Sequence, residues 1–279
     1  MRIVHFSDPH ISAVPDSFGA LFDKRILGAA NYFLRRRWRH DDSLLAKAVE
    51  FILDDPPDAV VCSGDITSTG SPREFEMALD ALKPLLESRS TRLLYVPGNH
   101  DAYVRDRRCA DALRNAFAKL NGGEFQLEDL PVKARVGDCD FIMINETAPT
   151  NPFLSSGFLD AETAEKAAEL IGKTERKTRP AILVGHFPIK TAGKSLGNRR
   201  GLRGDGRTVL EKLLESGAID LSLCGHEHSN AIAVDETGRG EARAGAVTAS
   251  GDLNIIDYDS ERNAFSIEKI LPPYRGGTA

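Results

Sequence analysis

The sequence has no long uncharged segment and no region of biased composition. Its longest apolar stretch, Ile26 to Leu34, has nine residues, whereas a membrane-spanning helix needs about 20. No secretory signal is visible, because the charged Asp8 comes before an apolar region can build up. With 41% hydrophobic and 28% charged residues, the chain is typical of a globular α/β protein that buries a core. Disordered, collagen-like and membrane-spanning classes are therefore not expected.

Cysteine is scarce, and its four residues form no C-x-x-C pair. Cys62 and Cys224 end apolar runs, where a free thiol behaves as a small hydrophobic group. A zinc–thiolate site needs clustered sulfur atoms, so a structural role is expected for all four. This cysteine usage favours a cytoplasmic protein without disulfides.

Basic residues are fewer than acidic ones, 36 against 41, which gives a formal net charge of -5. A nucleic-acid partner is therefore not expected. A local exception is a basic amphipathic insertion at about residues 22–40, which has six basic residues against the single acid Asp23. Such a segment favours peripheral contact of residues 24–39 with an anionic membrane surface, on the inner face of the membrane. The alternative is an amphipathic helix that packs on the body with a solvated basic face.

Short apolar runs recur along the chain, and most of them end in a loop that carries polar residues. Continuous runs of this length are typical of strands that are buried on both faces. The runs are Ile3–Phe6, Ala59–Cys62, Leu93–Val96, Ile182–Val184 and Leu221–Cys224.

Helical spacing of apolar residues separates these runs. It predicts helices at 44–53 and 209–214, a helix that begins at a Ser71–Glu74 capping box, and one capped by Asp160. After residue 230, strands are expected at 232–234, 246–248, 255–258 and 265–270. No linker is visible, so residues 1–271 are predicted to form a single domain, with a flexible tail at 272–279.

Five of the seven histidines follow the apolar runs: His10, His100, His186, His226 and His228. Carboxylates and an amide accompany them at Asp8, Asp65, Asn99 and Asp101. Loops at the carboxyl ends of strands are where open α/β sheets bind ligands. We therefore expect these side chains to gather at one edge of a sheet. Asn145 and Glu146 end another apolar run and could line the same cleft, but no motif supports them.

Imidazole and carboxylate donors without thiolate suit divalent Mn, Fe, Zn or Ni, rather than calcium. One catalytic zinc ion uses about three protein ligands, whereas this chain offers seven candidates. That number suits two divalent ions about 3.5–4 Å apart that share a carboxylate. We expect Mn²⁺ first, with Fe, Zn or Ni as alternatives. The candidate ligands are Asp8, His10, Asp65, Asn99, His186, His226 and His228.

The order of these residues resembles the five sequence blocks of the calcineurin-like metallophosphoesterase superfamily. The blocks span residues 8 to 228 and read Asp8-Pro9-His10, Gly64-Asp65, Gly98-Asn99-His100-Asp101, Gly185-His186 and Gly225-His226-Glu227-His228. The resemblance implies a four-layer αββα sandwich, in which two mixed β-sheets are flanked by helices and a dinuclear metal centre lies at one edge.

The resemblance also implies a role for each residue. The first metal would bind Asp8, His10 and His228, the second would bind Asn99, His186 and His226, and Asp65 would bridge the two. The catalytic residues would be His100, which faces the scissile phosphate and protonates the leaving oxygen, and Asp101, which orients His100. The implied reaction is hydrolysis of a phosphodiester or pyrophosphate bond, with attack by a hydroxide that the two metals share.

The substrate is less well defined. The residues after Gly64-Asp65 lack the Asp-Arg-Gly of protein serine/threonine phosphatases, and the chain is more similar to compact bacterial members. These include cyclic-nucleotide phosphodiesterases and pyrophosphohydrolases that cleave UDP-diacylglucosamine. The second possibility fits a basic loop at 190–207, in which Arg199, Arg200 and Arg203 are predicted to bind a second phosphate.

We therefore expect a small phosphoester or pyrophosphate substrate, such as a nucleotide-linked lipid precursor. One alternative is a cyclic-nucleotide phosphodiesterase. Another is a non-catalytic metal-binding scaffold, against which the filled ligand positions and His100 argue.

Overall fold

A computed structural model describes residues 1–13, 40–150, 154–172, 179–191 and 201–274. Most of the predicted basic insertion, from residue 22 to residue 39, lies outside the described residues. So do Arg199 and Arg200, whereas Arg203 and His40 lie within them.

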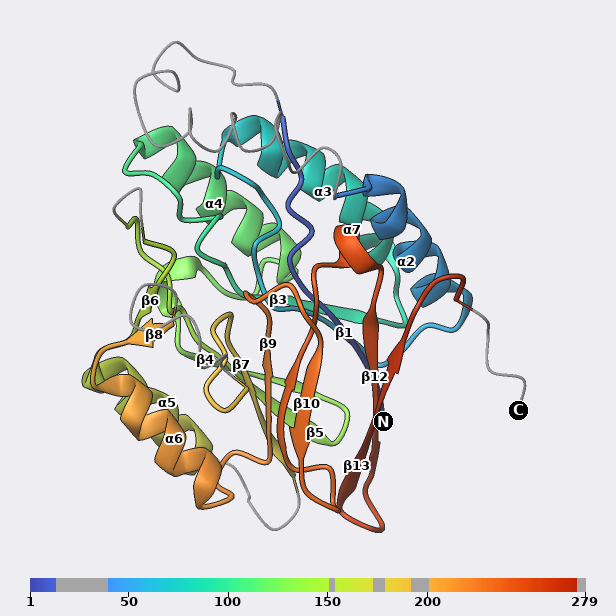
Figure 1. The fold of residues 1–279 in the computed structure, drawn as a ribbon, viewed down its shortest axis with the longest axis vertical. Helices are drawn as coiled ribbons and strands as arrows, with labels where there is room; N and C mark the ends of the chain where they lie inside the picture. Colours follow the sequence, from blue (N-terminus) through green and yellow to red (C-terminus); the bar gives the residue numbers. More distant parts are fainter. Residues whose placement is uncertain (14–39, 151–153, 173–178, 192–200, 275–279) are drawn as a thin grey trace.

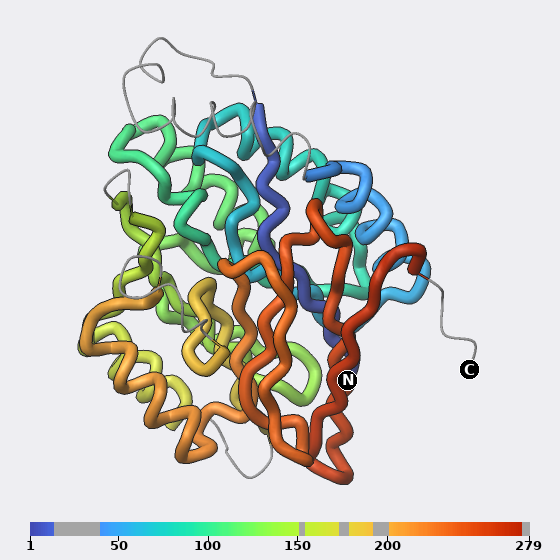
Figure 2. Tube along the Cα trace, in the orientation of Figure 1, coloured from blue at the N-terminus to red at the C-terminus, as the bar shows by residue number. Residues whose placement is uncertain are grey.

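The first sheet has five strands in the order β13-β12-β1-β2-β3. Strands β1 (Arg2–Phe6), β2 (Ala59–Cys62) and β3 (Arg92–Tyr95) are parallel to one another. Strand β12 (Leu253–Asp259) pairs antiparallel with β1, and β13 (Ala264–Ile270) pairs antiparallel with β12. Figure 2 shows the resulting contact between the first strand, β1, in blue, and β12, near the end of the chain, in red.

The second sheet has six strands in the order β10-β11-β9-β7-β5-β4. Strands β5 (Cys139–Met143), β7 (Ala181–Val184), β9 (Leu221–Cys224) and β11 (Gly240–Arg243) are parallel. The edge strands β4 (Val132–Val136) and β10 (Ala231–Val234) are antiparallel to their neighbours. A separate pair of short strands, β6 (Gly157–Phe158) and β8 (Leu202–Arg203), forms a two-stranded sheet.

Helices cover the outer face of each sheet (Figure 1). The first sheet is covered by α2 (Asp42–Asp54), α3 (Pro72–Glu87) and α4 (Arg107–Leu120), and the second by α5 (Ala161–Gly172) and α6 (Gly206–Glu215). The predicted capping box at the start of α3 is present, and the Asp160 carboxylate accepts a hydrogen bond from Thr163 N at the start of α5.

Alternating side chains of the strands build the layers. In β1, Val4 packs into the core shared with α2 and α3, whereas Ile3 points into the core between the two sheets. In β7, Ile182 points to that central core and Leu183 to the core under α5 and α6. Because successive residues of a strand face opposite sides, both sheets are covered on both faces. The predicted four-layer αββα sandwich of two mixed sheets is confirmed.

Two local predictions differ from the structure. The expected strand at 246–248 is a short helix, α7 (Val247–Ser250), which ends at Gly251 with a left-handed φ of 70°. The β-branched Val247 and Thr248 favour a strand by composition, but tertiary hydrogen bonds decide their conformation. Helix α4 was missed, although its buried Leu113 and Phe117 have helical spacing.

Within the described ranges, no helix has the length and apolar character needed to cross a membrane. Part of the predicted flexible tail is described and packs on the body. The Tyr274 ring lies 5.0 Å from that of Phe51 in α2, and its hydroxyl donates to the Gly251 carbonyl. Residues 275–279 lie outside the described residues.

Candidate metal centre

The loops that follow β1, β2, β3, β7 and β9 bring the predicted ligands together. Most of them are almost inaccessible, because Asp8, His10, Asp65, Asn99 and His186 are at most 5% exposed. The His228 side chain is 36% exposed, so the site opens to solvent on its side.

The first cluster joins Asp8, His10, Asp65 and His228, whose potential ligand atoms all lie within 4.8 Å of one another. Asp8 Oδ1 lies 3.4 Å from His10 Nε2 and 3.3 Å from His228 Nε2. The two imidazole nitrogens of His10 and His228 are 2.8 Å apart. These are the residues predicted for the first metal, together with the predicted bridging carboxylate.

The second cluster joins Asn99, His186 and His226. Asn99 Oδ1 lies 2.9 Å from His226 Nδ1 and 3.3 Å from His186 Nε2. Asp65 Oδ2 lies 3.4 Å from His186 Nε2 and 3.7 Å from His10 Nε2 in the first cluster. A single oxygen atom therefore faces both clusters.

Two atoms at the centre of this arrangement have no hydrogen-bond partner among the described residues. Asp8 Oδ1 and Asp65 Oδ2 are fully buried and accept no hydrogen bond. A buried carboxylate oxygen without a donor is costly, and a divalent cation would remove that cost. The donor set of imidazole, carboxylate and amide groups fits first-row divalent ions.

Hydrogen bonds to carbonyl oxygens fix two imidazole rings in the orientation that a ligand needs. His186 Nδ1 lies 2.7 Å from the Ser63 carbonyl oxygen, and His10 Nδ1 lies 3.3 Å from that of Thr67. Because a carbonyl oxygen only accepts, each Nδ1 carries the proton in the neutral ring, which leaves the Nε2 lone pair to face the cluster.

Backbone strain is concentrated at the same place. Six described residues other than glycine have a positive φ, and five of these are predicted ligands: Asp8, His10, Asp65, His226 and His228. Such conformations persist only where the surrounding structure holds them, and they cluster at functional sites. Position 98 needs glycine for a different reason. The Asp65 carboxylate lies so close to its backbone that a Cβ at Gly98 would collide with it.

Charge interactions in the cluster oppose the effect of burial. Burial alone would raise the pKa of Asp8 and Asp65, but the facing imidazoles hold both pKa values well below the usual range. Burial lowers the pKa of His186, but Asp65 and Asp8 outweigh it and raise this pKa to about 10. The site therefore stabilises positive charge, which suits cation binding.

His100 lies beside the first cluster, with its ring 4.9 Å from that of His10 and stacked on Tyr103 at 5.1 Å. Its Nδ1 atom is 2.6 Å from the Ser68 carbonyl oxygen. This bond places the proton on Nδ1 in the neutral ring.

The structure corrects the expected contact between Asp101 and His100, because the Ser68 carbonyl occupies His100 Nδ1. The buried Asp101 carboxylate instead accepts hydrogen bonds from the backbone of Thr67 and Gly98 and from the Tyr95 hydroxyl. Burial and the neighbouring Asp65 raise the pKa of Asp101 to about 6. Asp101 ties together the loops that follow β2 and β3, which carry Ser68 and His100.

Two buried carboxylates support the site without a sequence signal. Glu146 was named without a motif, and Glu241 was not predicted. Glu146 Oε2 accepts from the backbone N–H groups of His186 and Phe187, at 2.7 and 2.9 Å, and burial raises its pKa to about 7. Glu241 accepts from the backbone of Ile189, Lys190 and Thr191. Neither has a local motif, since their partners come from distant parts of the chain.

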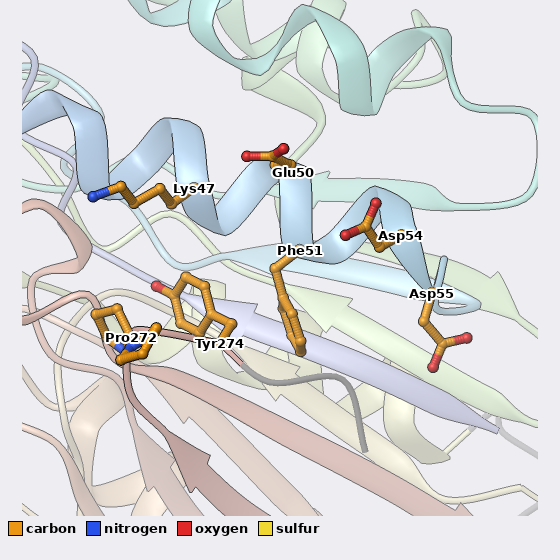
Figure 3. Close-up of a pocket in the computed structure, with 8 residues that line it drawn as sticks. Lys47, Glu50, Phe51, Asp54, Asp55, Pro272 and Tyr274 are labelled. Carbon is orange, nitrogen blue, oxygen red and sulfur yellow. The ribbon is translucent and has the colours of Figure 1, made fainter. Parts of the chain in front are cut away.

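Other predicted or cavity-lining residues lie away from the clusters. Arg203 is exposed on β8, beside the exposed Phe158 of β6. Figure 3 shows a separate pocket of about 360 Å³ between α2 and the segment 272–274. Its lining residues include Lys47, Phe51 and Tyr274 but none of the predicted ligands.

Comparisons with solved structures agree with the fold. A solved dimetal phosphatase from Danio rerio has a TM-score of 0.60 and 13% identity, covering 95% of this chain and 98% of that chain. The purple acid phosphatase PPD1 from yellow lupin (Lupinus luteus) seeds also has a TM-score of 0.60, with 14% identity, and covers 97% of this chain and 51% of that chain. At 13–14% sequence identity, the similarity to these structures shows a common fold and nothing more.

No curated protein sequence matches the chain. The family model of calcineurin-like phosphoesterases matches residues 1–230, which include all seven predicted ligands. The chain therefore belongs to the calcineurin-like phosphoesterase family of metal-dependent phosphoester hydrolases.

Proposed function

We propose that this enzyme, a single domain over residues 1–271, hydrolyses a phosphodiester or pyrophosphate bond at a pair of divalent ions. The observation that carries the proposal is the shared position of Asp65 Oδ2, which faces His10 in one cluster and His186 in the other. The proposed ligands are Asp8, His10 and His228 for one ion and Asn99, His186 and His226 for the other, with Asp65 between them.

When bound, the two ions would neutralise phosphate charge and would lower the pKa of a bound water toward 7. The protein contributes a rigid arrangement of donors. Asp8 and Asp65 stay anionic because imidazoles face them, and the hydrogen bond of His186 to Ser63 keeps its Nε2 lone pair directed at the site. Burial excludes water from the ligand side chains and strengthens their interaction with a cation.

His100 is the proposed general acid. Its Nδ1 is held by the Ser68 carbonyl, so that Nε2 is the atom that can give a proton to the leaving oxygen. Stacking on Tyr103 limits rotation of the ring. Asp101 acts as a positioning residue. Its carboxylate accepts hydrogen bonds from the backbone N–H of Thr67, the neighbour of Ser68, and from that of Gly98, two residues before His100.

For the substrate we propose a pyrophosphate-linked molecule that carries a lipid, such as UDP-diacylglucosamine. Its second phosphate would bind the basic residues at 190–207. The described part of that segment includes the exposed side chains of Lys190 and Arg203. Strand β6, the partner of β8, lies against Phe187, whose ring is 4.3 Å from that of His226. This proximity supports a role of the β6–β8 pair near the second cluster.

The position of the basic insertion in the chain supports the lipid part of the proposal. Before it, Ser12 Oγ lies 2.6 Å from Ser68 Oγ, next to the carbonyl that holds His100. After it, the His40 ring lies 5.4 Å from that of His10. Residues 14–39 are thus flanked in sequence by two residues at the rim of the site, and their basic and apolar side chains suit an acylated, anionic ligand.

The test compares substrates with the purified full chain and added Mn²⁺. Hydrolysis of bis-p-nitrophenyl phosphate would support a phosphoesterase, whereas metal binding without any hydrolysis would favour a non-catalytic scaffold. UDP-diacylglucosamine should be cleaved faster than cyclic AMP and faster than a nucleoside diphosphate sugar without acyl chains. Turnover of cyclic AMP alone would overturn the lipid proposal in favour of a cyclic-nucleotide phosphodiesterase.

Membrane contact has a separate test. The wild-type chain should float with vesicles that contain phosphatidylglycerol and not with pure phosphatidylcholine vesicles, because the proposed attraction is electrostatic. Substitution of Arg35, Arg36, Arg37 and Arg39 by Gln should abolish flotation. Equal flotation of both proteins would show that the basic insertion does not contact the membrane.

A further inference from the structure

Helix α7 lies directly against the loop that carries Asp8 and His10. Val247 N donates to the Ser7 carbonyl at 3.0 Å, and Thr248 Oγ1 donates to the Pro9 carbonyl at 2.7 Å. These two carbonyls precede and follow Asp8. The Thr248 side chain is fully buried, so its bond to Pro9 is protected from water.

The loop needs such support because of its backbone. Asp8 has a φ of 54° and His10 a φ of 50°, and Pro9 lies between them. Two residues with side chains in the left-handed region are maintained only by their surroundings. The Thr248 hydroxyl is the described side-chain donor to the carbonyl between these two strained residues.

His40 makes a second bond to the same hydroxyl. Its Nδ1 lies 2.7 Å from Thr248 Oγ1, and the backbone N–H of Asp41 donates to the Thr248 carbonyl at 2.7 Å. A hydroxyl has one proton, and Thr248 gives it to Pro9, so His40 Nδ1 must be the donor of this bond. The His40 ring meets that of His10 edge to face, at an interplanar angle of 81°.

We propose that Thr248 positions the first metal-binding loop and that His40, acting through Thr248, couples the start of α2 to that loop. The inference rests on the proposed function, because it takes Asp8 and His10 as ligands. Thr248 lies beyond residues 1–230, the part matched by the family model. Its bonds place it as a positioning residue, since it contacts the loop backbone rather than the ligand atoms.

The experiment measures Mn²⁺ binding to Thr248→Val, which keeps the shape of the side chain and removes the hydroxyl. One of the two ions should bind about 10- to 100-fold more weakly, as when a supporting contact of a metal ligand is lost. The spin-coupled electron paramagnetic resonance signal of a manganese pair should decrease at the metal concentration that saturates the wild type. Thr248→Ser should restore both properties. Ser250→Ala, in the same helix, is the matched control and should bind as the wild type does.

The His40 link is tested with two amides. The amide nitrogen of Asn takes the place of Nδ1, whereas that of Gln takes the place of Nε2. His40→Asn should therefore bind Mn²⁺ nearly as tightly as the wild type. His40→Gln should lose about two- to tenfold, which is the effect of one hydrogen bond. In a Thr248→Val background both substitutions should have less effect, because the acceptor is already absent.

The outcomes separate this proposal from the proposed function. A wild-type chain that binds no divalent ions would overturn the proposed function. Two ions in the wild type and equal affinity in Thr248→Val would overturn only the role of Thr248. Should Thr248→Val fail to fold, the Asn and Gln variants of His40 still decide, and equal weakening by both would overturn the coupling.

Discussion

The two sheets hold their metal-binding loops in different ways. In the first sheet, the loops after β1 and β2 bond to each other through the main chain. Asp8 N donates to the Gly64 carbonyl, and His10 N donates to that of Asp65, at 3.0 and 2.9 Å. The ladder continues to Ile11 and Ile66, so this half of the site is an extension of sheet pairing.

In the second sheet, one main-chain bond joins the loops after β7 and β9, from Gly225 N to the His186 carbonyl at 3.0 Å, and buried charged side chains add further support. Glu146 holds the backbone at His186, and Glu241 holds the three residues from Ile189 to Thr191. The Arg243 guanidinium bonds to the Glu227 carboxylate at 2.6 Å, within the loop that carries His226 and His228.

This difference predicts different sensitivities to mutation. Main-chain bonds survive most side-chain changes, so the first half should tolerate substitutions that leave the supporting hydrogen bonds of Thr248 and Asp101 in place. The second half depends on particular buried carboxylates, whose loss leaves N–H groups without partners.

The largest effect is expected at Asp65, the side chain that both halves share. Asp65→Asn removes the charge between the clusters, so both ions should bind weakly and activity should fall by about 10⁴-fold or more, the several kcal/mol that metal ions supply. Metal content by mass spectrometry and hydrolysis of bis-p-nitrophenyl phosphate check this. Normal content of both ions would contradict a bridging role for Asp65.

His100→Ala should lower turnover by about 10²- to 10⁴-fold, the usual contribution of a general acid. The metals should stay bound, because the His100 side chain bonds to the Ser68 carbonyl and not to a ligand. Its removal leaves the main-chain bonds between the loops after β1 and β2 intact. The loss should shrink with a more acidic leaving group, which needs less protonation. Full activity with a weakly acidic leaving group would refute the role.

Much of this arrangement could be predicted from the sequence, for a definite physical reason. Apolar runs predict buried strands, and the carboxyl ends of parallel strands meet at one edge, so residues such as His10 and His186 were expected together. The pairing of β1 with β2 and of β7 with β9 agrees with this within each sheet. His10 and His186 follow strands of different sheets, however, so the expected single sheet edge is in fact two edges that meet. The family pattern added the division into two clusters.

The supporting residues could not be predicted in this way. Glu146 and Glu241 act on backbone groups 40 or more residues away in sequence, and no local pattern records such a contact. Thr248 was assigned to a strand because its neighbours are β-branched or small. Its bond to Pro9 across 239 residues depends on the packing of β12 beside β1.

Below the metal loop of the first half, His5 predicts a loss of stability in acid. Burial lowers its pKa to about 3, while the unfolded chain takes up the proton near pH 6.5. The unfolded state therefore binds more protons between these values, and stability falls as the pH is lowered through this range. Through His5 alone, the free energy of unfolding should fall by about 3 kcal/mol as the pH is lowered from 6.5 to 4.

Urea unfolding of the chelated protein measures this effect. His5→Gln should show a weaker pH dependence than the wild type in acid, although it is less stable at pH 7 through the lost contact with Ser63. A proton magnetic resonance titration of His5 with a midpoint near 6.5 would contradict the prediction.

Glu146→Ala tests the second half directly. Without the carboxylate, the N–H groups of His186 and Phe187 lose their acceptor, and the second ion should bind about 10- to 100-fold more weakly. Glu146→Gln is the matched control, because its amide oxygen still accepts both bonds. Calorimetric titration with Mn²⁺ separates them. Equal weakening by Ala and Gln would mean that charge, rather than the hydrogen bonds, supports the loop.

The smallest effect is expected at Arg203, which is exposed on the β6–β8 pair. Arg203→Gln should raise KM for a pyrophosphate substrate by less than about tenfold, since an exposed guanidinium gains little from one ion pair. It should leave kcat and the KM for bis-p-nitrophenyl phosphate unchanged, because that substrate has no second phosphate. Lys166→Gln, on the exposed face of α5, is the control for a general loss of charge. An equal rise of KM for both substrates would place Arg203 in the support of the second half rather than in recognition of a second phosphate.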